Sequence, residues 1–246
     1  MADEMLRVNK LLSEAGVCSR READRWVADG RVTADGRRVQ VGEQISRNAD
    51  IRVDGRRIHR EEQKVLLMLN KPRGIICTAR RGERDSVVRF IQYPIRVYPV
   101  GRLDKDSEGL LLLTNQGELV NRIMRAGNFH EKEYEVTVDR EMTEEFLKGM
   151  GEGVPILDTV TRPCKVTAAG PCTFRITLTQ GLNRQVRRMC AYFGYEVKKL
   201  KRVRIMNLIL GDLPVGRYRE VSAEEREELD RLLAGSSSLS WKERHG

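Results

Sequence analysis

The chain holds few of the residues that bind metals or form disulfides. Its five cysteines are an odd number, are scattered and include no C-x-x-C pair, and its three histidines are not clustered with them. These residues are Cys18, Cys77, Cys164, Cys172, Cys190, His59, His130 and His245. The pattern predicts reduced thiols in a cytosolic protein, and it argues against a disulfide framework, a zinc site or metal catalysis.

Long apolar runs are also missing. No segment approaches the length that spans a bilayer, and the N-terminus lacks the apolar core of a signal peptide. The chain has no glycine-rich loop of the kind that binds nucleotide phosphates. We therefore expect a cytoplasmic protein without a membrane anchor.

Positive charge is what the chain has in excess. Lys and Arg number 45 against 36 Asp and Glu, which gives a net charge of +9, and Arg supplies most of the positive charge. Because guanidinium groups suit phosphate, nucleic acid is the natural partner of such a chain. The length of 246 residues predicts one large domain or two unequal ones.

Residues 101–115, G-R-L-D-K-D-S-E-G-L-L-L-L-T-N, combine charge with a core strand. The second half is a continuous apolar run, which is typical of a fully buried strand. The first half is a loop with five charged residues, and loops held by a rigid scaffold often carry chemistry. From the residues alone, a solvated turn before a core strand is an equally good interpretation.

This stretch closely resembles the signature of the pseudouridine synthases, in particular the RsuA/RluB/RluE/RluF group that modifies ribosomal RNA. The motif of that group reads G-R-L-D-x-D-[ST]-x-G-L-L-L-L-T-[ND]. The resemblance implies that Asp104 is the catalytic carboxylate, acting either as a nucleophile at the anomeric carbon or as a base on the adjacent ribose carbon. It also makes Arg102 a candidate to fill the space that an extracted base vacates, and it assigns Asp106 no catalysis.

The N-terminal region has the pattern of a small helical and hairpin module. Apolar spacing predicts a helix over residues 5–15, and a capping box at residues 19–22 predicts a second helix that ends near Gly30. Two strand-like pieces, residues 31–40 and 50–57, each contain Asp-Gly-Arg-Arg, which is typical of a tight hairpin turn.

This module resembles the alpha-L RNA-binding domain known from a small-subunit ribosomal protein, over about residues 5–60. The resemblance implies RNA binding, and the candidate contacts are Arg7, Lys10, Arg20, Arg21, Arg25, Arg37 and Arg38. A solvated charged surface on a structural cap is the alternative.

A polar linker is expected over residues 59–64, followed by a strand that ends at the turn N-K-P-R-G. Its Lys71, Pro72 and Gly74 match a K-P-x-G turn of the family, and we expect a structural role, because proline and glycine shape the backbone.

Residues 132–138 alternate as a strand that places Tyr134, Val136 and Val138 on one face. The residues alone favour a core tyrosine with a satisfied hydroxyl. The resemblance, through the K-x-Y setting, implies instead that Tyr134 is the second active-site residue, stacking on the loosened uracil.

Residues 183–190, N-R-Q-V-R-R-M-C, predict a helix whose apolar residues share one face. Arg184 and Arg188 point away from that face and are candidates for phosphate contacts. Arg187 falls at its border, and the resemblance makes it the basic residue of the third motif, apposed to Asp104. An apposed cation favours the ionised carboxylate.

The end of the chain predicts three further elements. Residues 198–204 form a basic strand pair that flanks the cleft, a capping box at Ser222 and Glu225 begins a final helix that stops at Gly235, and residues 236–246 form a disordered tail.

Together these features predict an α+β protein: an alpha-L RNA-binding domain (5–60) and a synthase domain (64–235) with a mainly antiparallel mixed sheet. The resemblance to the RluF branch implies that the protein isomerises a uridine of 23S ribosomal RNA, without a cofactor or metal. The expected partner is a 23S stem-loop, either in free RNA or within a ribosome assembly intermediate, and the protein is expected to be a monomer. The alternative is a non-catalytic RNA-binding or ribosome-associated protein that retains the fold.

Overall fold

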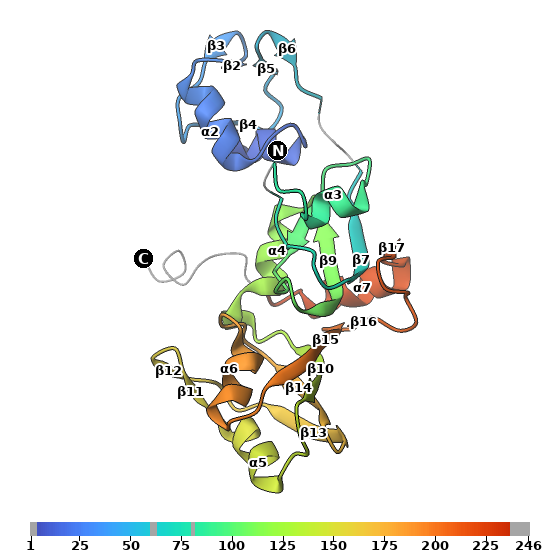
Figure 1. Ribbon diagram of the computed structural model, residues 1–246. Coiled ribbons are helices and arrows are strands. Elements are labelled where there is room, and N and C mark those ends of the chain that lie inside the picture. Colours follow the sequence, from blue (N-terminus) through green and yellow to red (C-terminus); the bar gives the residue numbers. More distant parts are fainter. Residues whose placement is uncertain (1–3, 60–62, 80–81, 237–246) are drawn as a thin grey trace. The chain divides into compact units, whose positions relative to one another are not determined.

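The computed structural model describes residues 4–59, 63–79 and 82–236 (Figure 1). It divides into two compact units: residues 1–65 with 93–97 and 115–117, and residues 66–92, 98–114 and 118–246. The predicted tail from residue 237 on, and residues 60–62 of the predicted linker, lie outside the described residues. The predicted domain boundaries stay predictions.

The first unit consists of two short helices and small antiparallel sheets. The helices are α1 (Val8–Glu14) and α2 (Arg20–Ala28). A four-stranded sheet has the order β3-β2-β5-β6, and β1 pairs with β4. The strands are β1 (Met5–Arg7), β2 (Val32–Ala34), β3 (Arg37–Arg38), β4 (Gln44–Ser46), β5 (Ile51–Val53) and β6 (Arg56–Arg57). The capping box predicted at the start of α2 is confirmed. Glu22 N–H donates to Ser19 Oγ at 3.2 Å and Ser19 N–H to Glu22 at 3.4 Å, so the capping box forms.

Both hairpins of the first unit turn at Asp-Gly. The φ angles are 50° and 81° at Asp35 and Gly36, and 49° and 77° at Asp54 and Gly55. Positive φ at both central residues is what the tight turns of β-hairpins require.

The predicted helix over residues 5–15 is wrong at its start. Met5–Arg7 form β1, in which Leu6 pairs with Ile45 of β4, and both side chains are buried. A strand partner some 40 residues away therefore overrides the local helical spacing.

The second unit is built on a nine-stranded sheet with the order β13-β14-β10-β15-β9-β7-β17, to which β8 and β16 add at β9 and β15. Neighbouring strands are antiparallel, except β9 and β15, which are parallel. The strands of this sheet are β7 (Leu66–Lys71), β8 (Tyr98–Val100), β9 (Glu108–Thr114), β10 (Lys132–Val138), β13 (Lys165–Gly170), β14 (Thr173–Leu178), β15 (Val197–Ile205), β16 (Leu208–Ile209) and β17 (Tyr218–Glu220). The predicted α+β class with a mainly antiparallel mixed sheet is confirmed.

Helices pack on this sheet through two apolar cores. Leu119 of α4 and Leu229 of α7 join one core with β7 and β9, whereas Phe146 of α5 and Met189 of α6 join the other with β10 and β14. The remaining elements are α3 (Val87–Ile91), α4 (Gly117–Met124), η1 (Ala126–Asn128), α5 (Glu144–Glu152), α6 (Gln185–Tyr192), α7 (Ala223–Leu232) and the hairpin β11 (Pro155–Ile156) and β12 (Thr159–Val160). No helix in the described part of the chain combines the length and apolarity needed to cross a membrane.

Strand β9 is the buried centre that the apolar run predicts, since its residues 110–113 are fully buried. Gly109, at its start, lies against β15: a Cβ there would stand 2.3 Å from the backbone oxygen of Arg202. The φ of Gly109 is 99°, so both conformation and space require glycine.

Residues 198–204 do not form the predicted strand pair. They belong to the single strand β15, which lies between β10 and β9 in the sheet. Leu200 and Arg202 are buried on this strand, so a basic sequence occupies a central position.

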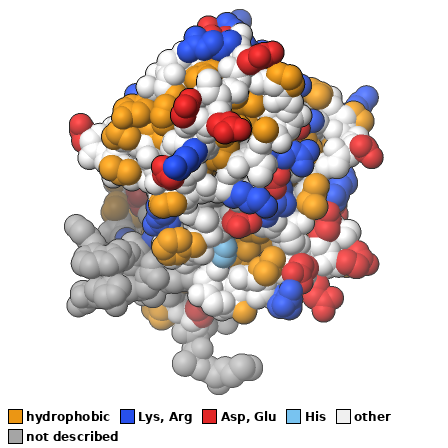
Figure 2. All heavy atoms as spheres, turned by 90° about the horizontal axis from the view of Figure 1, so that it is seen from below, with side chains coloured by type: hydrophobic (Ala, Val, Ile, Leu, Met, Phe, Trp, Pro, Cys, Tyr) orange, Lys and Arg blue, Asp and Glu red, His pale blue; other side chains and the backbone are white. Residues whose placement is uncertain are grey.

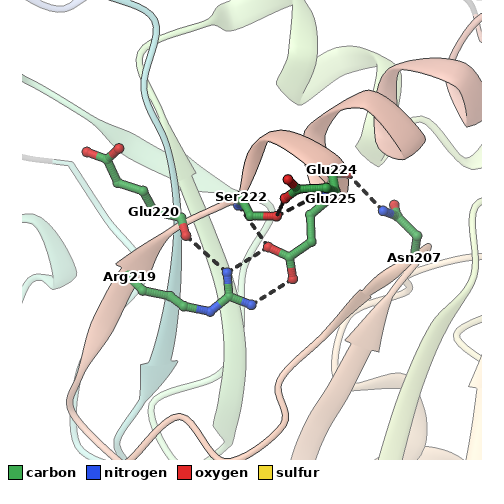
Figure 3. Close-up of polar contacts among 6 residues, drawn as sticks. All are labelled: Asn207, Arg219, Glu220, Ser222, Glu224 and Glu225. Atoms are coloured by element: carbon green, nitrogen blue, oxygen red, sulfur yellow. Dashed lines mark hydrogen bonds and ion pairs between the residues drawn. The ribbon is translucent and has the colours of Figure 1, made fainter.

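The start of α7 is held by the polar contacts drawn in Figure 3. Glu225 N–H donates to Ser222 Oγ, which confirms the predicted capping box, and Arg219 donates to both Glu225 carboxylate oxygens at 2.6 and 2.7 Å. Asn207 donates to the Glu225 carbonyl at 2.9 Å. The helix ends at Leu232 rather than at Gly235, because the chain continues in turns from Leu233 on.

Candidate active site

A pocket of about 310 Å³ opens in the second unit beside the loop that precedes β9. The loop 101–107 forms one wall, strands β10 and β15 form the floor, and the segment 178–186 forms the opposite wall. Its polar lining consists of Arg102, Asp104, Ser107, Lys132, Tyr134, Gln180, Asn183, Arg184, Gln185 and Arg202. Four segments far apart in the sequence thus meet at one cavity.

Asp104 lies in the wall of this pocket. Its side chain is 33% exposed, and Oδ2 is 3.5 Å from Arg184 Nη1. The loop is fixed on both sides, because Ser107 N–H donates to the Asp104 carbonyl and Leu103 N–H donates to Cys77 Sγ at 3.3 Å. The carboxylate is therefore presented to the cavity by an ordered backbone.

The K-P-x-G turn at residues 71–74 also holds the loop 101–107 in place through hydrogen bonds. Lys71 is fully buried, and its Nζ donates to the carbonyls of Pro72 and Ser107, both at 2.8 Å. Burial lowers the pKa of Lys71. Gly74 N–H donates to the Lys105 carbonyl at 2.8 Å. These contacts agree with the structural role that the sequence predicts for the turn.

Arg184 reaches the carboxylate because it precedes helix α6 instead of belonging to it. It has a φ of 51° and caps the helix, which begins at Gln185. Gln185 is buried and accepts from Leu182 N–H at 3.0 Å, which fixes the turn before the helix. The expectation that Arg184 points outward with Arg188 assumed one continuous helix, so it missed this ion pair with Asp104.

Arg187 lies next to the loop, but it contacts backbone. Its guanidinium donates to the carbonyls of Val197 at 3.1 Å and Asp106 at 3.3 Å. Burial and then the charge of Arg184 lower the pKa of Arg187, while Asp104 acts in the opposite direction. Within the described residues, the ion pair of Asp104 is with Arg184, so the predicted apposition of Arg187 and Asp104 is indirect.

Tyr134 lies on the pocket floor, half-buried on β10 and opposite Arg202 of β15. Val136 and Val138 are buried in the core on the same strand, so the predicted apolar face is confirmed. Tyr134 and Asp104 therefore line one cavity from different elements.

Two further predicted RNA contacts, Arg102 and Arg188, lie near this site. Arg102 is exposed and lines the pocket. Arg188 is exposed and donates to Asn183 O and Oδ1 at 3.1 and 3.3 Å, which keeps it on the outer side of α6.

Some candidate RNA contacts of the first unit form ion pairs with carboxylates of the protein, and others form none in the part of the chain that the structure describes. Lys10 pairs with Glu14 at 3.7 Å, and Arg37 pairs with Glu43. The other candidates are exposed and form no ion pair within the described residues; they are Arg7, Arg20, Arg21, Arg25 and Arg38.

Lys132 and Arg202 are site residues that the sequence interpretation missed. Both line the pocket, and their relative exposures are 4% and 1%. Burial, followed by the charge of Arg202, lowers the pKa of Lys132 to about 8. The alternation of β10 places Lys132 on the same face as Tyr134, and this was the one sequence signal that could have identified Lys132 as a pocket residue.

Comparisons with known proteins agree with these features. The sequence model of the RNA pseudouridylate synthase family matches residues 65–192, and that of the S4 domain matches residues 6–51. The chain is 54% identical to the dual-specificity RNA pseudouridine synthase RluF of Salmonella typhi over 240 residues, covering 97% of this chain and 83% of the relative.

More distant relatives also match over nearly the whole chain. Ribosomal large subunit pseudouridine synthase B of Bacillus subtilis is 36% identical over 237 residues, which cover 93% of this chain and 97% of the relative. A crystal structure of a pseudouridylate synthase superposes with a TM-score of 0.67 at 29% identity, covering 92% of this chain and 99% of that one.

Proposed function

Because this chain belongs to the RNA pseudouridylate synthase family, we propose that it isomerises a uridine of 23S ribosomal RNA to pseudouridine. The observation that carries the proposal is the complete motif at residues 101–115, which presents Asp104 to a pocket of about 310 Å³. The choice of 23S RNA is supported by the similarity to RluF and to a large-subunit synthase.

The reaction begins with extraction of the target base, which costs roughly a few kcal/mol of unstacking. The bond between ribose C1′ and uracil N1 then breaks, and its electron pair leaves with the uracil. Asp104 acts either as the nucleophile that bonds to C1′ or as the base that takes the C2′ proton. The uracil then turns, and its C5 bonds to C1′. In the nucleophile route this bond displaces Asp104 from C1′, and in the base route Asp104 returns the proton to C2′. Finally the C5 proton is removed and N1 gains a proton. Substrate and product are isomers, so the chemistry needs no redox partner or group donor.

The neighbours of Asp104 suit this role. Arg184 pairs with the carboxylate directly, and Arg187 braces the same loop through the Asp106 carbonyl. Both routes need a carboxylate that faces the cavity, and these two guanidinium groups hold it there. In this proposal Tyr134, which lines the pocket floor, stacks on the loosened uracil and is a candidate to accept the C5 proton. Arg102 at the pocket wall would fill the space of the extracted base.

The first unit supplies RNA affinity in this proposal. Its exposed arginines would bind phosphates, and RNA shape together with splayed bases would select the site. Figure 2 shows a face on which acidic and basic side chains are interspersed, so the net charge of +9 does not form a uniform basic surface there. We also propose that the protein acts as a monomer in the cytoplasm, on a 23S stem-loop in an assembling ribosome.

In vitro modification of separate 23S and 16S transcripts tests this proposal. Purified protein is incubated with each RNA, and pseudouridines are mapped at single-nucleotide resolution. Conversion of a 23S uridine and none in 16S is the expected result. RNA binding without conversion would favour a non-catalytic RNA-binding protein, and release of free uracil would indicate a glycosidase.

A further inference from the structure

The floor of the pocket carries two buried cations, and among the described residues no carboxylate forms an ion pair with either of them. Arg202 is 1% exposed, and its Nε donates to the Leu110 carbonyl at 2.7 Å. Lys132 is 4% exposed, and its Nζ donates to the His130 carbonyl at 3.1 Å. Neither forms an ion pair within the described residues, and the charge that acts on Lys132 is that of Arg202.

Such an arrangement is unfavourable unless something else occupies the cavity. Two like charges in a low-dielectric site repel, and desolvation penalises each of them. The sequence could place apolar residues at these central strand positions, as it does at Leu200 on β15. The cations therefore point to a ligand that brings negative charge to the floor.

Unmet hydrogen-bonding groups line the same cavity. Arg202 Nη2 is buried and has no hydrogen-bond partner within the described residues, and the same holds for Ser107 Oγ and Gln180 Nε2. Buried polar groups without partners are rare in proteins and call for an explanation. Three of them, from the loop, from β15 and from the segment after β14, converge on one pocket that contains Asp104.

We infer that Arg202 and Lys132 are further catalytic residues, which bind the carbonyl oxygens of the uracil ring and stabilise the negative charge it acquires when it leaves the ribose. The inference rests on the proposed function. When the C1′–N1 bond breaks, the electron pair is shared by N1 and the two carbonyl oxygens of the ring. Donors already in place where charge develops stabilise the transition state without reorganisation.

In this inference different residues of the pocket act on the ribose and on the base. Asp104 and its partner Arg184 lie on the walls and act on the sugar, whereas Arg202 and Lys132 lie on the floor with Tyr134 and act on the base. Gly109 lets β15 approach β9 closely, and the Arg202 side chain donates to the Leu110 carbonyl of β9, which fixes its position on the pocket floor. The pocket thus has an anionic group for the ribose and cationic groups for the leaving ring.

Leaving-group substitution tests this inference. A stem-loop RNA that wild-type protein converts is made with either uridine or 5-fluorouridine at the target, and consumption of the target nucleoside is followed in single turnovers. Fluorine withdraws electrons and stabilises the detached ring anion, so protein cations matter less for that substrate. The variants are Arg202→Met and Lys132→Met, and the control Lys148→Met removes one positive charge on α5, from an exposed pair with Glu152.

Arg202→Met is expected to slow the uridine reaction by roughly 10²–10³-fold, the loss typical of removing one oxyanion donor. For 5-fluorouridine, the factor by which the variant slows the reaction should be smaller by about tenfold or more. Lys132→Met is expected to show the same asymmetry, and it keeps the test decisive if Arg202→Met does not fold. RNA affinity should be unchanged in both, and Lys148→Met should match wild type.

Equal losses on the two substrates, in folded variants, would overturn the inference and leave Arg202 and Lys132 as structural residues. Conversion of neither RNA by the wild type would overturn the proposed function instead, and the inference with it. The two failures are therefore distinguishable.

Discussion

Asp104 and Arg184 form an ion pair with 3.5 Å between Oδ2 and Nη1, and the arginine that makes it stands just before helix α6 in a left-handed conformation. Arg187, in the first turn of the helix, donates to the Asp106 carbonyl instead. Two guanidinium groups thus serve one loop in different ways, the first on the carboxylate and the second on the backbone. The following predictions separate these contributions and test the framework that positions them.

Arg184→Met removes the direct partner of the carboxylate. We expect kcat/KM to fall about fivefold, because a partly exposed ion pair that holds the Asp104 carboxylate in position is worth roughly 1 kcal/mol. Arg184→Lys should recover part of the loss. The measurement is steady-state conversion of a 23S stem-loop, with Lys148→Met as the control for loss of one charge. Full activity in Arg184→Met would show that this pair has no part in the reaction.

Gly109→Ala tests the close approach of β9 and β15. We expect a destabilisation of about 3 kcal/mol or more, because the added Cβ would collide with the Arg202 backbone and the left-handed φ penalises any side chain. Gly211→Ala is a matched control: its φ is 55°, and a Cβ there meets nothing within 4 Å. It should cost only about 1–2 kcal/mol. Urea unfolding measures both, and equal losses would contradict the packing described.

Lys132 makes stability depend on pH in a specific direction. Its pKa is about 8 in the folded protein against an ordinary 10.5, so between these values the unfolded chain binds the extra proton. Stability therefore rises with pH from about 8 to 10.5, by an amount on the order of 3 kcal/mol for this group. The charge that acts on it is that of Arg202, which lowers its pKa further after burial.

The pH prediction is measured as a difference between wild type and Lys132→Met. Buried thiols act in the opposite direction, since burial raises the pKa of Cys190 to about 12 and of Cys164 to about 11. Their contribution is the same in both proteins and cancels. Parallel curves of unfolding free energy against pH for the two proteins would show that Lys132 is not held at a lowered pKa.

Exposed arginines of the first unit should account for part of the salt dependence of RNA binding. Each phosphate contact that is lost should reduce the slope of log K against log salt by about 1. Substituting Arg20, Arg21 and Arg25 together by Ser should therefore weaken binding and flatten the slope by up to about 3. Thr33→Ser, which retains charge on the same unit, serves as the control in filter-binding titrations. An unchanged slope would show that RNA does not contact α2.

Substitution is a sharper test of the first unit than deletion. The polar linker predicted over residues 59–64 would allow residues 1–60 to be removed without harm to the larger domain. Residues 93–97 and 115–117 belong to the same compact unit as the N-terminus, and Arg96 donates to the Cys18 carbonyl. A truncation would leave these segments without their partners, so its effect on RNA binding would be confounded with misfolding.

The sequence predicted correctly those elements that are fixed by residues close to one another in the chain. The four leucines of β9, the two Asp-Gly turns and the capping boxes at Ser19 and Ser222 act through neighbouring residues, and the structure has all of them. They fix the strand, the hairpins and the helix starts by burial, backbone conformation and satisfied backbone donors.

Features that depend on distant partners were not predictable in this way. Leu6 forms a strand because Ile45 pairs with it, and Arg202 is buried because β15 lies between β9 and β10. A strand rich in Lys and Arg has the pattern of an exposed edge, and only the sheet order shows that it is central. The left-handed conformation of Arg184 likewise leaves no mark in the helical periodicity around it.

The most direct test of the central claim is tritium release from 23S ribosomal RNA that carries [5-³H]uridine. Wild-type protein should release one equivalent of tritium as water for each target uridine, since isomerisation replaces the C5 proton by a carbon bond. Asp104→Asn should release tritium at least about 10³-fold more slowly while it still binds the RNA. Release at the wild-type rate by Asp104→Asn would contradict the account, because the carboxylate at the pocket wall would then have no part in the chemistry.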